Sequence, residues 1–407
     1  AIYGKLEDND TLPYRNYTTG NPKTLNHLQY KDSIESDILT LTELSLFSLE
    51  FNENFDGYVM VASAAQKLAE PVKFNEETEQ WEVITDFDVT KDTAEAWMIT
   101  LSDELYWVNS AGVKGRKITV DDFEYTYQMA LDPVQSNSRA NYFYSSAGLP
   151  IKNAKKYFEQ LDEDGEKNIP NQGVKDGAYE TVPWSEVGFH RIDGQNAFII
   201  ELEQPYQQWD VHYNMSGFLW APVYKELFEA GFDKDRKLTS YGSKVENFMS
   251  SGPYVLTYWE DEKEIRYEKN PHFFYNDGVH KVTPNKISTV IVKDANAAIA
   301  LYERGELDVV GIPATHYEQY KNNPGLKKAD GAVSFRFSVN RQTQAESDLN
   351  FGVGAWKTKP ILQEDDFMWA LYFAMDRKTI AEDITKTNTA EQFYFTNAYV
   401  VDPLSGQ

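Results

Sequence analysis

The spacing of apolar residues between Thr119 and Pro133 predicts an amphipathic helix. The apolar positions recur at helical intervals, at Val120, Phe123, Tyr127 and Ala130 or Leu131. Thr119 is a helix-capping residue, and Asp122 is placed three residues later to accept from the Thr119 backbone, as in a capping box. Pro133 ends the helix because proline disfavours helical geometry in the residue before it. We therefore interpret the aspartates of the first turn as capping residues rather than catalytic ones.

The same patterns predict further elements along the chain. Strands are expected at 79–89, 94–102, 104–108, 188–191 and 198–202, the last two joined as a hairpin. Residues 33–47 keep helical spacing, and residues 365–384 predict one long helix with acidic residues at its start. The polar stretch 157–180 contains glycine, proline and many charges, and it predicts a surface loop.

A strand–helix–strand unit is predicted between residues 286 and 312. Residues 286–292 are rich in β-branched side chains, and residues 307–312 predict a second strand. Between them, Asp294 is placed to cap a helix that Gly305 ends in a left-handed conformation. Such a unit implies a right-handed parallel crossover, and ligands on sheets of this kind bind beyond the carboxyl ends of the strands. The fold class is therefore α/β.

Composition narrows the functional classes. The 407 residues are too many for one ordinary core, so more than one domain is expected. A net charge of −25 argues against nucleic acid as a partner and against an anionic membrane surface. The absence of cysteine excludes thiolate nucleophiles and cysteine-based zinc sites within this chain. No stretch has the length of a membrane span, and no signal-like segment opens the chain.

Motifs for catalysis, metals and cofactors are missing from the sequence. There is no phosphate-binding loop, no dinucleotide fingerprint and no nucleophile elbow. The six histidines never have the spacing of a helical zinc site. We therefore expect no metal, no cofactor and no enzymatic activity. A pair of carboxylates that cleaves glycosides stays open, because sequence does not give the separation of two carboxylates.

Several stretches resemble the family 5 extracellular solute-binding proteins, the oligopeptide-binding group. The most characteristic is residues 104–133, with a tryptophan-containing strand, a glycine turn, Thr, Asp-Asp-Phe and a final Asp-Pro. Four more stretches match in the same order, at 21–27, 250–274, 298–310 and 365–380. These include an early Asn-Pro loop, a Gly-Pro-Tyr segment, Gly-Glu-Leu-Asp and an Asp-Arg helix. The resemblance extends over about residues 21 to 380.

The resemblance implies a periplasmic-binding-protein-like type II fold with two lobes and an extra small domain. The expected segments are 1–44 for the first part of lobe I, 45–180 for the additional small domain, 181–265 for the second part of lobe I, and 266–407 for lobe II. Family members usually continue past the Asp-Arg helix, so lobe II is expected to be incomplete at its carboxyl-terminal end in this chain.

The same resemblance implies a function outside the cell. It implies a monomeric receptor that captures peptides between its lobes and delivers them to the membrane permease of an ABC transporter. The expected location is the extracellular face of the membrane or a periplasm, with membrane association only through an N-terminal lipid-bearing cysteine that this chain does not contain. The alternatives are an oligosaccharide or metal-chelate receptor on the same scaffold and, from another class, a secreted glycoside hydrolase.

Candidate ligand-binding residues follow from the positions of the family motifs. A receptor that accepts many peptides must bind the peptide backbone, which all peptides share, and must leave its side-chain pockets roomy. The resemblance assigns ligand contact to the early loop, an aromatic loop, the Gly-Pro-Tyr segment and a strand of lobe II. The residues are Tyr30, Lys31, Asp32, Ser33, Tyr142, Tyr144, Ser251, Gly252, Phe335, Phe337 and Asn340.

Overall fold

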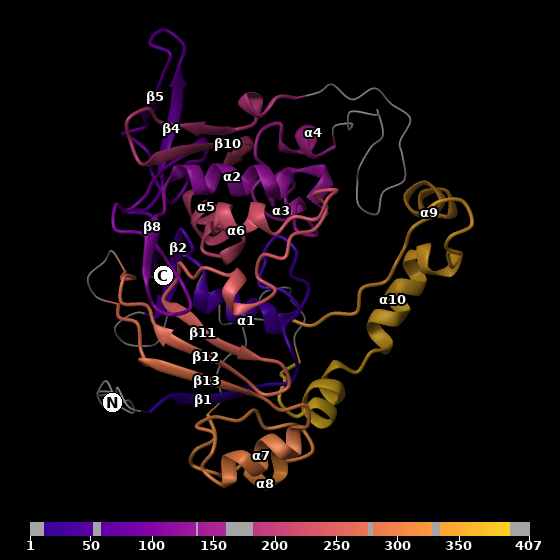
Figure 1. Ribbon diagram of the computed structural model, residues 1–407. Coiled ribbons are helices and arrows are strands. Elements are labelled where there is room, and N and C mark those ends of the chain that lie inside the picture. Colours follow the sequence, from indigo (N-terminus) through magenta and orange to yellow (C-terminus); the bar gives the residue numbers. More distant parts are fainter. Residues whose placement is uncertain are drawn as a thin grey trace. The chain divides into compact units, whose positions relative to one another are not determined.

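The computed structural model describes residues 12–51, 58–135, 137–159, 182–275, 280–327 and 334–390. These residues form two compact units: the first contains the described residues up to Val309, and the second those from Val310 onward. Figure 1 shows the sheets of the first unit and the helices of the second. None of the helices in these described ranges is long and apolar enough to cross a membrane.

A five-stranded antiparallel sheet lies in the first unit. Its order is β5 (Gln80–Val83), β4 (Glu70–Asn75), β6 (Ala94–Thr100), β10 (Ala197–Tyr206) and β9 (Phe189–Arg191). The pairing of β9 with β10 confirms the predicted hairpin. Helix α2 (Val120–Leu131) covers one face of this sheet (Figure 1), where the rings of Phe123 and Phe198 lie 5.5 Å apart. Burial of such aromatic surface stabilises the packing of the helix on the sheet.

The predicted caps of α2 are present. The Thr119 N–H donates to Asp122 Oδ2 at 3.0 Å, and the helix ends at Leu131 with Asp132 in an extended conformation. The buried carboxylate of Asp122 also contacts Arg116, with 2.7 Å between Oδ1 and the guanidinium nitrogen. Asp122 therefore joins α2 to the preceding hairpin of β7 (Tyr106–Val108) and β8 (Lys114–Lys117). This contact agrees with the interpretation of Asp122 as a structural residue.

A four-stranded sheet forms the other layer of the first unit. Its order is β1 (Tyr14–Thr18), β13 (Lys286–Ile291), β12 (Glu264–Lys269) and β11 (Tyr254–Glu260). β1 and β13 run parallel, and the other neighbours are antiparallel. Helix α1 (Ser33–Thr42) packs against β11. The sequence-predicted boundary at residue 266 falls inside β12, which belongs to the first unit. The division into four segments stays a prediction.

The strand–helix–strand prediction is confirmed in one part and wrong in another. Helix α7 (Ala295–Glu303) has the predicted cap, since Asp294 Oδ1 accepts from the Ala297 N–H at 2.9 Å, and Gly305 has a φ of +74°. However, residues 307–312 form no strand, and the parallel neighbour of β13 is β1. Asp308 instead binds Arg15: the Asp308 N–H donates to the Arg15 carbonyl at 2.9 Å, and the two side chains form an ion pair of 2.6 Å.

The helix predicted over residues 33–47 is shorter than expected. α1 ends at Thr42 because the Glu43 backbone turns to an extended conformation, with φ −107° and ψ 155°. The chain then enters β2 (Phe47–Phe51), which pairs with β3 (Tyr58–Ala62). Four shorter helices complete the first unit: α3 (Asn141–Tyr144), α4 (Ala154–Phe158), α5 (Gln208–Met215) and α6 (Lys225–Ala230). Of the predicted loop 157–180, the first two residues end α4, and the part from residue 160 lies outside the described residues.

The second unit is helical in its described part. It contains α8 (Tyr317–Tyr320), α9 (Gln344–Phe351) and α10 (Asp365–Ala374). The single helix predicted over 365–384 is wrong, because Met375 is extended with a ψ of 107° and Thr379–Thr385 forms a separate π-helix. Residues 334–340 form no strand, contrary to the strand expected there.

Candidate functional site

The early loop of the first unit is organised by one buried carboxylate. Glu35 Oε1 accepts from the N–H groups of Lys23 and Thr24 at 2.8 and 3.0 Å. Its Oε2 accepts from the N–H groups of Lys31 and Asp32 at 2.8 and 3.4 Å. Glu35 is 1% exposed, so loss of its carboxylate would leave four partly buried N–H groups without their acceptor. Glu35 therefore fixes the backbone that carries the predicted ligand contacts.

Asp32 acts as the amino-terminal cap of α1. Its Oδ1 accepts from the N–H groups of Ile34 and Glu35 at 3.1 and 3.2 Å, and Glu35 completes a capping box. The neighbouring side chains of Lys31 and Ser33 are exposed. The spacing Asp-x-x-Glu is the sequence signal for this arrangement, and our sequence reasoning did not use it.

Tyr30 lies at the centre of an aromatic and cationic group, here called the Tyr30 cluster, made of Tyr30, Arg139, Tyr142 and Phe218. The ring of Phe218 meets the Tyr30 ring edge-on, with 5.2 Å between centres. The guanidinium of Arg139 lies 4.7 Å from the centre of the Tyr30 ring. Burial raises the pKa of the Tyr30 hydroxyl, the positive charge of Arg139 opposes this, and the Tyr142 hydroxyl adds to it. The cluster thus joins the early loop to α3 and to the segment after α5.

Tyr144 is not part of this cluster. It lies two residues after Tyr142 on the single turn of α3, so the two side chains leave the helix in different directions. The Tyr144 ring stacks on Phe158 of α4, with 5.2 Å between centres and an interplanar angle of 28°. Burial and the nearby Glu159 raise the pKa of its hydroxyl. The structure therefore gives Tyr144 a packing contact, and its predicted ligand contact stays untested.

Ser251 and Gly252 lie at the opposite end of α1. The N–H groups of both residues donate to the Thr42 carbonyl at 2.9 Å, and Ser251 Oγ accepts from the Leu44 N–H at 3.1 Å. A Cβ on Gly252 would lie 2.4 Å from the Glu43 carbonyl oxygen. Since the ten residues of α1 extend over about 15 Å, these residues are separated from Lys31 and Ser33 by the length of the helix. Both are buried, and their predicted ligand contact is likewise untested.

A buried pair of titratable residues, His27 and Glu43, lies at the carboxyl-terminal end of α1. His27 Nδ1 lies 2.7 Å from Glu43 Oε2, with side-chain exposures of 0% and 2%. Burial raises the pKa of the Glu43 carboxyl, and His27 opposes that rise. Tyr241 is also buried here, and burial together with Glu43 raises the pKa of its hydroxyl. The enclosed position of His27 gives it a structural role beside Glu43.

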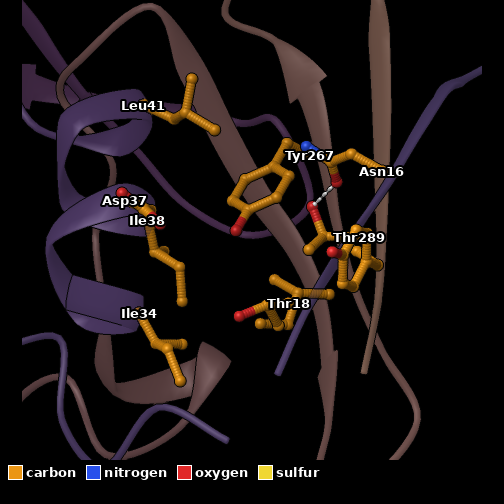
Figure 2. A pocket seen from close by; sticks show the side chains of 10 residues that line it. Asn16, Thr18, Ile34, Asp37, Ile38, Leu41, Tyr267 and Thr289 are labelled. Carbon is orange, nitrogen blue, oxygen red and sulfur yellow. Dashed lines mark hydrogen bonds between the residues drawn. The ribbon is translucent and has the colours of Figure 1, made fainter. Parts of the chain in front are cut away.

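A small cavity of about 80 Å³ lies between α1 and the four-stranded sheet (Figure 2). Asp37 lines it from α1, and the side chains of Thr18, Tyr267 and Thr289 line it from the sheet. Thr289 Oγ1 donates to Asn16 Oδ1 at 2.5 Å, as Figure 2 shows. Burial raises the pKa of Asp37. Pockets for drug-sized ligands measure about 300–1,000 Å³, so this cavity suits a few water molecules and not a peptide.

The remaining predicted contacts belong to the second unit. Phe335 and Phe337 are 84% and 74% exposed, and Asn340 accepts the Gln342 N–H with its side chain at 3.0 Å. These residues lie on an irregular segment rather than on the expected strand, and their role in ligand contact is untested. In the described ranges, no three His, Cys, Asp or Glu side chains come together in a manner that would hold a metal ion.

Two members of the Tyr30 cluster were missed by sequence reasoning. Arg139 lies three residues before Tyr142, and a spacing of three residues places two side chains on one face of a helical turn. That spacing was a usable signal for Arg139. No comparable signal exists for Phe218, because it meets Tyr30 from 188 positions further along the chain.

Curated relatives at about one-quarter identity are binding proteins. The chain is 23% identical over 316 residues to the dipeptide-binding protein DppE of Bacillus subtilis, which covers 76% of this chain and 48% of DppE. It is 23% identical over 297 residues to the oligopeptide-binding protein OppA of the same organism, covering 73% and 45%. It is also 23% identical over 314 residues to YgiS of Escherichia coli, a probable deoxycholate-binding periplasmic protein, covering 77% and 47%. The chain thus spans about half the length of these relatives.

Solved structures confirm the fold class. The pheromone receptor PrgZ matches with a TM-score of 0.60 and 19% identity, covering 91% of this chain and 58% of PrgZ. The substrate-binding domain of an oligopeptide ABC transporter from Bacillus anthracis matches with a TM-score of 0.56 and 19% identity, covering 76% and 47%. At this level of identity the likeness establishes the fold alone, which is the expected mixed α/β fold of periplasmic binding proteins.

Residues 78–401 match the family model for the middle region of the bacterial extracellular solute-binding proteins, family 5. The match covers most of the chain and includes α2, both large sheets in part, and the helices of the second unit. The members of this family bind solutes and are not enzymes, which confirms the preference for binding over catalysis. The chain belongs to the bacterial extracellular solute-binding proteins of family 5.

Proposed function

We propose that this chain is part of a receptor that binds peptides outside the cell and delivers them to the permease of an ABC transporter. The observation that carries the proposal is the family match over residues 78–401. Relatives named as dipeptide-binding and oligopeptide-binding proteins support a peptide as the solute. A monomer that is held at the extracellular membrane face by a lipid anchor, or free in a periplasm, is the form we expect for the whole protein.

We place the peptide contacts of the first unit at the amino-terminal end of α1. Lys31 and Ser33 are exposed there, and the half-buried Tyr142 is the aromatic residue that we expect a peptide to contact, while Tyr30 belongs to the buried core beneath it. An aromatic surface accepts many side chains through apolar contact, while polar groups beside it bind the peptide backbone that all sequences share. Ser251 and Gly252 support the opposite end of α1 and contribute to the site by holding the helix in place.

The proposal is tested by native mass spectrometry of the purified chain after dialysis against a randomised pentapeptide mixture. Parallel samples receive sodium deoxycholate or a mixture of malto-oligosaccharides at the same concentration. We expect mass increments of single pentapeptides and none from the other two solutes. Retention of deoxycholate or of an oligosaccharide in place of peptides would move the assignment to another solute of the same family, and a hydrolysed oligosaccharide would contradict the receptor assignment altogether.

A further inference from the structure

We propose that Arg139 binds a carboxylate group of the ligand, an inference that rests on the proposed function and specifies the ligand's chemistry. In the first unit, every other arginine contacts a carboxylate of the protein: Arg15, Arg116, Arg191, Arg236, Arg266 and Arg304. Arg139 contacts no carboxylate among the residues that the structure describes, although the chain has 64 acidic residues. An arginine without such a partner is therefore unusual among the arginines of the first unit.

The position of Arg139 is fixed by its surroundings. The Arg139 N–H donates to Asn137 Oδ1 at 2.8 Å, and its carbonyl accepts from the Tyr142 N–H at 2.9 Å. Asn137 is itself buried and donates to the Ala130 carbonyl at the end of α2. The backbone of Arg139 is thus held by α3 and, through Asn137, by α2. Ligand binding therefore costs little conformational entropy in this backbone.

Stacking on Tyr30 orients the guanidinium and leaves its hydrogen-bond donors available. The guanidinium lies 4.7 Å from the ring centre of Tyr30, and an arginine above an aromatic face keeps its N–H groups free to donate at its edge. Those donors have the fork geometry that matches a carboxylate. Arg236 provides the contrast: it lies 4.1 Å from the ring centre of Phe232, but Glu229 already occupies it at 2.9 Å.

The charge of the whole chain strengthens this inference. A net charge of −25 repels anionic ligands in general, so a carboxylate is held only where a local positive charge outweighs that field. Arg139 provides a positive charge over the Tyr30 ring, and the exposed Lys31 follows Tyr30 directly in sequence. The carboxylate belongs either to the peptide's carboxyl terminus or to an aspartate or glutamate side chain.

The test uses the randomised pentapeptide mixture in two forms, one with a free carboxyl terminus and one with a carboxyl-terminal amide. The purified chain and its Arg139→Gln variant are dialysed against each form, and the retained peptides are quantified by mass spectrometry. We expect the unmodified chain to prefer the acid form about tenfold, or to retain from the amide form mainly peptides with Asp or Glu, and we expect Arg139→Gln to lose that preference. The first result identifies the terminus as the source of the carboxylate, and the second identifies the side chain.

Two variants separate recognition from structure. Arg139→Lys keeps the charge and should retain part of the preference, whereas Arg236→Gln removes an arginine that is stacked but already paired and should retain all of it. Thermal unfolding of each variant, followed by circular dichroism, reports any loss of folding. Peptides retained with equal preference by Arg139→Gln and the unmodified chain would overturn this inference and leave the peptide receptor intact. Failure of the unmodified chain to retain any peptide would contradict both proposals.

Discussion

The two ends of α1 differ in how their polar groups are satisfied. At the amino-terminal end, the Glu35 carboxylate accepts four backbone N–H groups, Asp32 caps the helix, and the side chains of Lys31 and Ser33 remain exposed. At the carboxyl-terminal end, Glu43 faces His27 in an enclosed interior, and Gly252 packs directly on the helix terminus. The amino-terminal end, here called the open end, therefore has a fixed backbone and exposed side chains. The carboxyl-terminal end, here called the sealed end, is buried and holds the helix in place.

This difference divides the predicted ligand-contact residues into two groups, one at each end of α1. Both ends carry predicted ligand contacts, but Lys31 and Ser33 are exposed, whereas Ser251 and Gly252 are buried and their N–H groups already donate to Thr42. Substitutions at the sealed end should therefore act mainly on stability. Substitutions at the open end should act mainly on binding, provided that the network around Glu35 is kept.

The largest effect is expected from Gly252→Ala at the sealed end. The added methyl group would lie 2.4 Å from the Glu43 carbonyl oxygen and 2.7 Å from its carbon, which are backbone atoms that cannot rotate away. We expect a loss of about 3 kcal/mol in the free energy of unfolding, measured by urea denaturation, because overpacking forces the backbone to shift. Gly217→Ala is the matched control, since its nearest atom lies at 3.7 Å, and it should change stability little. Equal stability of the two variants would contradict the close contact.

Glu35→Gln should have the next largest effect, at the open end. An amide keeps one acceptor oxygen but replaces the other with a donor, so two of the four partly buried N–H groups lose their partner. We expect a loss of about 2 kcal/mol by urea denaturation, and weaker peptide retention because the loop bearing Lys31 is released.

The control for Glu35→Gln is Glu260→Gln, which alters an exposed carboxylate that pairs with Lys263. Exposed ion pairs contribute about 0–1 kcal/mol, so this change should hardly be detected. An unchanged stability of Glu35→Gln would mean that the loop is held by apolar contacts of Tyr30 rather than by the carboxylate.

The features that the sequence predicted correctly are local. The capping of α2 by Thr119 and Asp122, the capping of α7 by Asp294 and the left-handed Gly305 all depend on residues within one or two turns. Hydrophobic period and capping chemistry determine such features without information about the rest of the fold. The hairpin of β9 and β10 was predictable for the same reason.

The features that the sequence did not reveal join distant segments. β13 pairs in parallel with β1, so that Ile287 lies opposite Tyr14. The hydrophobic pattern of one strand does not indicate which distant strand will pair with it. Arg139 meets Tyr30, and Gly252 meets Glu43, each across more than 100 residues of sequence. In the second unit the apolar residues of 365–384 keep helical spacing throughout, yet the backbone of Met375 is extended. Here tertiary context overrides propensity.

Glu43→Gln is expected to show an effect that depends on pH. Because burial raises the pKa of Glu43, the folded protein favours its protonated form, and this contribution to stability is complete below the ordinary glutamate pKa. It is lost as the pH rises through the raised value. Glutamine stays neutral, so the variant should match the unmodified chain at pH 4 and should have a higher melting temperature at pH 8.

The competing outcome for Glu43 would reveal the charge state of the buried pair. If the pair is instead ionic in the folded protein, Glu43→Gln removes one of two buried charged partners and lowers the melting temperature instead of raising it. Glu50→Gln, in the neighbouring strand β2, provides a control for the loss of one carboxylate. A melting temperature that follows the same pH profile in all three proteins would contradict both forms of the pair.

The smallest effect on stability is expected from substitutions of Asp32. These substitutions distinguish a role in helix capping from a role in ligand contact. Asparagine is as good a helix cap as aspartate, so Asp32→Asn should keep the bonds to Ile34 and Glu35, whereas Asp32→Ala should lose about 1 kcal/mol. Since Asp32 already serves α1, we expect Asp32→Asn to retain pentapeptides as the unmodified chain does, measured in the same dialysis. If Asp32→Asn is stable but loses peptides with a free amino terminus, then the Asp32 charge binds that terminus, and the open end of α1 presents groups of both signs to the ligand.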